Sequence, residues 1–195
     1  MSNDTIFQLR PGRSCGACTA CCIEPTIDSP ELKKPPGVRC PSCTGKGCAV
    51  YEARPAVCRE YHCLWRMTLL DLGEEWRPDR SGVMVVPEER DIPPGFEPFG
   101  YRFDLIGPPS VGLWPAALTW DPLVILMATA VELNIPVFLG VPAPPGHTGR
   151  KMFMNYAMVA GAKAHNLQQL RDALIAAYQE GVHTPSPEIV FAEAV

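Results

Sequence analysis

The sequence predicts an α+β fold in which a loop-rich, cysteine-rich metal knot packs on a small α+β body. All nine cysteines lie between Cys15 and Cys63, and the 132 residues after Cys63 contain none. The 22 prolines are about twice the average share and indicate many loops and short elements. We expect residues 1–66 to form the cysteine-rich module and residues 67–195 to form the body, together as one compact unit.

The first part of the module has few regular elements. Residues 15–22 are expected to be a loop that leads into the first turn of a helix, which would place Cys18 and Cys22 on one face. Residues 40–48 contain a proline and two glycines, as a tight turn around sulfur requires. This region is therefore expected to be held together by its cysteines rather than by long helices or strands.

The second part of the module is expected to be more regular. Residues 49–51 form a short strand candidate. Pro55 is well placed to start a helix at its first position. On that helix Cys58 and His62 would stack four positions apart, and the apolar residues that follow would carry the knot onto the body.

The body contains alternating signals for strands and helices. Residues 82–87 and 101–106 are strand candidates bounded by glycine and proline, and residues 137–141 form a third. Asp121 and the proline after it predict a helix from about 122 to 133, apolar nearly all round and therefore buried.

The last helix has a clear start and end in the sequence. Asn166 is expected to cap it, with Gln169 in the capping-box position. Leucine, isoleucine and tyrosine then form one apolar stripe, and Gly181 is expected to end the helix.

The cysteine spacing predicts a metal or iron–sulfur centre. Residues 15–22 read Cys-Gly-Ala-Cys-Thr-Ala-Cys-Cys, and Cys40 and Cys43 repeat the C-x2-C spacing. One such turn presents two thiolates to one ion, and two turns complete a tetrahedral shell. Inert thiols and disulfides are the alternatives; nine is an odd number, and a reducing compartment disfavours disulfides. Because Cys21 and Cys22 are adjacent, we assign them to different centres or different roles.

These cysteines resemble the family of zinc- or iron-chelating domains with the C-x2-C-x2-C-C signature. The resemblance covers roughly residues 13–66, including the string Tyr-x2-Arg-Pro-x2-Cys-Arg that begins at Tyr51. It implies metal ligands at eight cysteines and leaves Cys43 as an extra, less certain one. Those eight are Cys15, Cys18, Cys21, Cys22, Cys40, Cys48, Cys58 and Cys63. Flagellin lysine methylases contain a similar cluster, but nothing in residues 67–195 extends that activity to this chain.

The metal itself stays open between Zn²⁺ and a [4Fe–4S] cluster, because both take four thiolates. The ferredoxin-type spacing of the first run slightly favours iron–sulfur or iron. Either centre with four thiolates carries a net charge of −2, which nearby cations can offset. We predict that Arg54 and Arg59 hydrogen-bond the cluster sulfurs or nearby carbonyls, with solvated surface arginines as the alternative.

Two weaker candidates involve histidine and methionine. His62 could replace a thiolate, although an exposed or packed histidine is the commoner case. Met152, Met154 and Met158, with His147 or His165, could form a soft copper site, but methionine usually fills gaps in apolar cores. His147 also lies in a glycine-flanked loop that could touch a ligand. No nucleophile elbow, P-loop or dinucleotide motif is present in the sequence.

Composition limits the partners and the compartment. The net charge is −4, without a basic stripe, so we expect no nucleic-acid partner. Residues 1–4 lack the features of a secretory signal, and the longest apolar run is far shorter than the ~20 residues that span a bilayer. We expect a cytoplasmic protein that does not bind membranes.

The sequence therefore predicts a metal-binding protein for metal handling, redox or docking to a protein partner. The alternative is a metalloenzyme, methylase-like or oxidoreductase-like, whose pocket lies between the cysteine knot and the C-terminal body.

Overall fold

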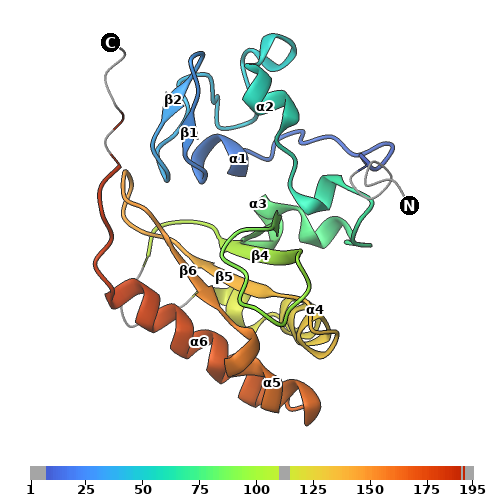
Figure 1. The fold of residues 1–195 in the computed structure, drawn as a ribbon. Coiled ribbons are helices and arrows are strands. Elements are labelled where there is room, and N and C mark those ends of the chain that lie inside the picture. The colour runs from blue at the N-terminus through green and yellow to red at the C-terminus, as the bar shows by residue number, and fades with distance from the viewer. Residues whose placement is uncertain (1–7, 110–114, 190, 192–195) are drawn as a thin grey trace.

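A computed structural model describes residues 8–109, 115–189 and 191. The fold is α+β, as the sequence predicts. Its centre is a four-stranded mixed sheet with the strand order β3-β4-β5-β6. The long helices cover one face of this sheet, and the cysteine-rich segment lies against the other (Figure 1).

The sheet combines antiparallel and parallel pairs. β3 (Val83–Glu88) runs antiparallel to β4 (Gly100–Leu105), and β5 (Val137–Val141) runs antiparallel to β6 (Arg150–Phe153). β4 and β5 are parallel and are joined through α4 (Asp121–Glu132), the crossover that a parallel pair requires.

Three helices form the main core with the sheet. α4 packs against α5 (Asn155–Lys163), which packs in turn against α6 (Leu167–His183). Side chains from every layer are fully buried between them. They include Phe103 of β4, Met127 of α4, Leu139 of β5, Met158 of α5 and Leu174 of α6.

Strand β3 is apolar at successive positions because both of its faces are covered. Val83 and Val85 point into the main core with the helices. Met84 and Val86 point the other way, where Met84, Val86 and Ala20 form a second, smaller apolar cluster. Since neighbouring residues of a strand face opposite sides, this strand joins the cysteine-rich segment to the body.

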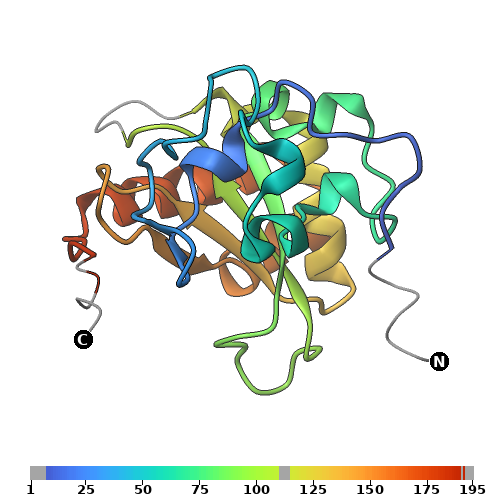
Figure 2. The ribbon, with the colours of Figure 1, turned by 90° about the horizontal axis from the view of Figure 1, so that it is seen from above.

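The cysteine-rich segment consists of short elements. α1 (Ala20–Ile23) precedes a small hairpin of β1 (Ile27–Asp28) and β2 (Lys33–Lys34), and α2 (Ala56–Glu60) follows. The 3-10 turn Tyr51–Ala53 also belongs to it. Two further 3-10 turns, Leu64–Arg66 and Glu74–Trp76, and α3 (Pro78–Ser81) then lead to β3, and Leu64, Trp65 and Trp76 are buried in the main core. Seen from above, the blue α1 and the teal α2 lie over the sheet (Figure 2).

Most predicted elements of the body are confirmed to within a residue or two. The strand at 137–141 has the predicted bounds, and the Asn166 side chain caps α6 by accepting a hydrogen bond of 3.1 Å from the Gln169 amide. α6 continues past Gly181, however. A Cβ at that position would lie 2.8 Å from a Val141 methyl carbon, so glycine lets the helix pack closely on β5.

Two predictions in the module are wrong, and two elements of the body were not predicted. Residues 49–51 form no strand, because a turn leads there directly into a 3-10 helix. α2 ends at Glu60 and Tyr61 is extended, so Cys58 and His62 do not share a helical face. β6 and α5 were not predicted.

Among the described residues, no helix is both long and apolar enough to cross a membrane.

Candidate metal centre

Most of the cysteines surround one cavity in the N-terminal segment. The cavity has a volume of about 370 Å³ and lies among α1, the turns after it and α2. All nine cysteines are described residues and are free thiols. The seven that line this cavity are Cys15, Cys18, Cys21, Cys22, Cys40, Cys48 and Cys58.

Cys63 does not line the large cavity but lies beside three of its cysteines. It lines a much smaller cavity of about 20 Å³ together with Cys15, Cys18 and Cys21. The side chain of Tyr61 borders both cavities and lies between them and the sheet. All eight cysteines expected as ligands therefore border one of two adjoining cavities.

The electrostatic contacts among the thiols separate them into two groups. Burial raises the pKa of the Cys63 thiol to about 11, and the charges of Cys15 and Cys18 add to this rise. Burial also raises the pKa of Cys58, but there the added charges are those of Cys40, Cys22 and Cys48. Cys63 thus neighbours the first cysteines of the chain, whereas Cys58 neighbours the later ones.

The adjacent pair Cys21 and Cys22 connects the two groups. Contact with the Cys21 sulfur, followed by burial, raises the pKa of Cys22 far above its ordinary value, whereas Cys43 acts to lower it. Cys21 lines both cavities, and Cys22 lines only the larger one. This difference agrees with the expectation that the two residues have different roles.

The thiols do not already form a closed ligand shell. Within the described residues, no three or more histidine, cysteine, aspartate or glutamate side chains are grouped closely enough to hold a metal ion. The donor set nevertheless fits a thiophilic metal in its chemistry, because free thiols from four segments of the chain line one cavity.

Cys43 differs from the other cysteines. It is 9% exposed, is the only one of the nine cysteines that is buried, and lines neither of the two cavities. Its backbone forms an antiparallel bridge with Cys48 and thereby closes the 40–48 turn. Its side chain contacts the Cys22 thiol, and this contact acts to lower the pKa of Cys22.

Arg54 and Arg59 hydrogen-bond carbonyl groups near the cysteines. The Arg54 Nε donates to the Tyr51 carbonyl at 2.7 Å, and its guanidinium lies 3.7 Å from the centre of the Tyr51 ring. Arg59 donates to the Arg54 carbonyl. The charge of Arg54 also acts to lower the pKa of Cys58.

Two cations that the sequence analysis did not select also interact with the thiols. Arg66 donates from Nη1 to the Cys15 sulfur at 3.4 Å. Lys34 is 1% exposed, and its ammonium donates to the carbonyls of Ile23, Pro35 and Val38 at 2.7 to 2.9 Å. No spacing rule could have found them, because the turns of the chain bring Arg66 across 51 positions to Cys15.

The weaker candidates lie elsewhere. His62 is half-buried on the small cavity, and burial lowers the pKa of its imidazole. Met154 and Met158 are buried in the main core, and His165 is exposed with its Nδ1 3.8 Å from Glu132. This arrangement favours the gap-filling role of the methionines over a copper site.

Comparisons with known proteins give no match: no family model, no curated protein and no solved structure matches this chain.

Proposed function

We propose that the N-terminal segment binds metal, as an iron–sulfur cluster, iron or zinc, through its clustered cysteine thiolates. The observation that carries this proposal is the lining of one cavity by seven free cysteines. Isolated core thiols do not gather in this way, and a thiolate is the ligand that zinc and iron–sulfur clusters prefer. Zinc and iron–sulfur centres both remain within the proposal.

We assign the ligands to two centres. Cys15, Cys18, Cys21 and Cys63 line the small cavity together, and would form the first centre. The charges of Cys22, Cys40 and Cys48 act on the Cys58 thiol, and these four cysteines would form the second. Four thiolates per centre match a tetrahedral ion or a cubane cluster. Binding would require the cysteine side chains to turn toward the middle of each group, which their short, loop-borne segments allow.

The charges near the thiols support thiolate ligation. Each four-thiolate centre would carry a net charge of −2. Arg66 lies against the first group, and the buried Lys34 interacts with Cys22 and Cys40 of the second group and with Cys21 of the first. Cations so close to sulfur favour the thiolate over the thiol, which is the form that binds metal. Such a concentration of free thiols persists in a reducing compartment, so we also propose a cytoplasmic location.

The test is elemental analysis of protein purified without oxygen, with Cys43 as a matched control. We expect metal in the native protein, with brown colour if it is iron–sulfur and no colour if it is zinc. Cys58→Ser should lose about half of the metal, because one of two centres loses a ligand, and Cys63→Ser should lose the other half. Cys43→Ser should retain the full content. Metal-free protein, or equal loss in Cys43→Ser and Cys58→Ser, would contradict the assignment.

A second proposal is a metalloenzyme with its pocket between the cysteine-rich segment and the body. The observation that favours it is a large cavity at that boundary. Its floor is formed by β4 and β5, and one wall comes from residues 23–26 at the end of α1. Copurification of an organic ligand with the native protein would support this second function.

A further inference from the structure

The two proposed metal centres are anchored differently in the fold. The first centre includes Cys63, and the two residues that follow it, Leu64 and Trp65, are buried in the main core. The second centre includes Cys58, and the two residues that follow it are exposed. The chain therefore fixes one ligand of the first centre to the core, whereas the second centre has no such attachment at Cys58.

The first centre lies against strand β3. Cys18 and Cys63 pack on the small apolar cluster, which consists of Ala20 together with Met84 and Val86 of this strand. Cys63 also packs against the main core. Two of the four thiols are thus held between the cysteine-rich segment and the sheet, where an apolar shell limits the access of water and of other ligands to a metal.

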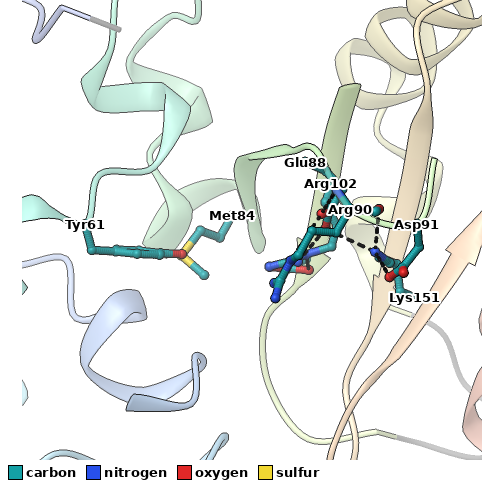
Figure 3. A network of polar contacts seen from close by, with 8 residues as sticks. Tyr61, Met84, Glu88, Arg90, Asp91, Arg102 and Lys151 are labelled. Atoms are coloured by element: carbon teal, nitrogen blue, oxygen red, sulfur yellow. Dashed lines mark hydrogen bonds and ion pairs between the residues drawn. The ribbon is translucent and has the colours of Figure 1, made fainter. Parts of the chain in front are cut away.

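Tyr61 and Met84 close the small cavity on the side of the sheet. Both side chains line this cavity, and the Tyr61 hydroxyl donates to the Met84 sulfur at 3.6 Å (Figure 3). The volume of the small cavity is about 20 Å³, which is room for about one water-sized species. A metal ion bound there leaves no space beside it for an incoming ligand.

The segment that carries most of the second centre has few buried contacts. Three of the four thiols lie within residues 40–60, all of which the structure describes, and Cys43 is the only buried residue there. Val50 and Tyr51, which line the large cysteine-lined cavity, are 41% and 36% exposed. A segment with so few buried apolar contacts opens locally at a small cost in free energy.

The large cysteine-lined cavity provides room beside the second centre. Its volume of about 370 Å³ suits a small organic molecule, and Ile27, Leu32 and Val57 give it apolar surface. All four thiols of the second centre line this cavity and not the small one. Three thiols of the first centre border both cavities, but Cys63 borders only the small one. A small molecule in the large cavity therefore meets the second centre directly and does not reach Cys63.

Exchange of a thiolate-bound metal needs space for an incoming ligand and a protein ligand that is able to leave. The second centre has both, since the cavity supplies the space and the exposed 40–60 segment carries the ligands. The first centre lacks the space at the small cavity, and Cys63 is held by the core. Thiolates are preferred ligands of zinc and of iron–sulfur clusters, so a small thiol is the class of molecule that competes best for the second centre.

We propose, on the basis of the metal binding proposed above, that the two centres have different roles. The first centre is a permanent structural site that holds the cysteine-rich segment on strand β3 through Cys63. The second centre is an exchangeable site that passes metal to and from a small thiol in the large cysteine-lined cavity. The exchange is a ligand substitution without electron transfer. On release, the bond from the metal to the Cys58 sulfur breaks, a bond to the sulfur of the small thiol forms, and the proton of that thiol passes to Cys58.

Timed removal of metal from the full chain tests this division of roles. Protein purified without oxygen is mixed with excess EDTA if it holds zinc, or bathophenanthroline disulfonate if it holds iron, and the metal still bound is measured after desalting. We expect two phases of about equal amplitude, whose rates differ at least about tenfold. 2-Mercaptoethanol should speed the fast phase only, whereas ethylene glycol, with oxygen in place of sulfur, should change neither. A single phase would overturn the division but not metal binding; a chain without metal would contradict both.

Variants assign each phase to a centre. Cys58→Ser should show only the slow phase, and Cys63→Ser only the fast phase. Because Cys63 also packs against the main core, Met84→Ala provides a second test. It opens the wall of the small cavity and should speed the slow phase at least about threefold, whereas Val50→Ala, at an exposed residue of the large cavity, should leave that phase unchanged. A fast phase that persists in Cys58→Ser, or an unchanged slow phase in Met84→Ala, would refute the proposal.

Discussion

Asp104 on β4 lies directly opposite Gly140 on β5, and a Cβ at position 140 would lie 2.0 Å from the Asp104 Oδ1 atom. No real side chain fits at that distance. The missing side chain at 140 therefore makes room for the Asp104 carboxylate, which accepts two hydrogen bonds from Arg102. The ion pairs of Arg102 with Asp104 and Glu88 on this face of the sheet therefore depend on the glycine at position 140.

The first prediction concerns this close contact. Gly140→Ala should lower the free energy of unfolding by about 1–3 kcal/mol, since the added methyl group must displace the Asp104 carboxylate from Arg102. Urea denaturation measures this change. In a double-mutant cycle, Asp104→Ala should cost less in the Gly140→Ala background than in the native chain. If the stability losses of Gly140→Ala and Asp104→Ala simply added in the double variant, the methyl group at position 140 would not act through Asp104.

The second prediction concerns the buried ammonium of Lys34. Lys34→Met keeps the aliphatic chain but leaves the carbonyls of Ile23, Pro35 and Val38 without their donor. We expect a loss of about 3 kcal/mol in the free energy of unfolding, measured by thermal or urea denaturation.

The neighbouring lysine provides the control for Lys34. Lys33→Met changes an exposed side chain whose Nζ lies 4.0 Å from Asp28, so it should change stability by less than about 0.5 kcal/mol. If both variants lost the same stability, the three carbonyl contacts would not be responsible.

The third prediction concerns Arg66 and metal retention. Arg66→Gln removes the donor to the Cys15 sulfur, whereas Arg59→Gln removes an arginine that bonds only the Arg54 carbonyl in the described residues. A hydrogen bond to a charged group contributes about 1.5–3 kcal/mol, so metal affinity should fall at least tenfold in Arg66→Gln. Competition with a chelator measures this affinity. A larger effect of Arg59→Gln would restore Arg59 as the more important arginine.

The fourth prediction concerns the pH dependence that Glu88 confers. Burial raises the pKa of this carboxyl, but the Arg90 amide, Lys151 and Arg102 outweigh burial and hold the pKa below its usual value. A depressed pKa in the folded state means that the stabilisation is complete above the unfolded value of about 4.3 and is lost as the pH falls through the folded value.

Glu88→Gln isolates this contribution. The native chain should exceed the variant in stability by roughly 1–3 kcal/mol at pH 7, and the difference should shrink as the pH falls below about 4. The measured quantity is the difference in unfolding free energy between the native chain and Glu88→Gln at each pH. This difference is needed because the raised pKa values of Asp104 and Glu24 change stability with pH in the opposite direction. A difference that does not vary between pH 7 and pH 3 would contradict the prediction.

The regular elements of the body were predictable because local rules determine them. The strand at 137–141 is apolar and bounded by proline, and the Asn166 cap satisfies a free helical amide in the predicted way. β6 and α5 were missed for a local reason as well. β6 is only half-buried, and α5 follows it directly with a weak apolar pattern, so neither differs clearly from loop by sequence.

By itself, the sequence determined the fold class, the segment that holds the cysteines and the start of the last helix, since each depends on residues close together in the chain. The tertiary structure alone decided which cation meets which thiol, which face of β3 meets the cysteine-rich segment, and where a cavity forms between them. Arg66 reaches Cys15 across 51 positions, and Asp104 fits only because Gly140 is opposite. Such contacts arise from how distant segments pack, and no spacing along the chain encodes them.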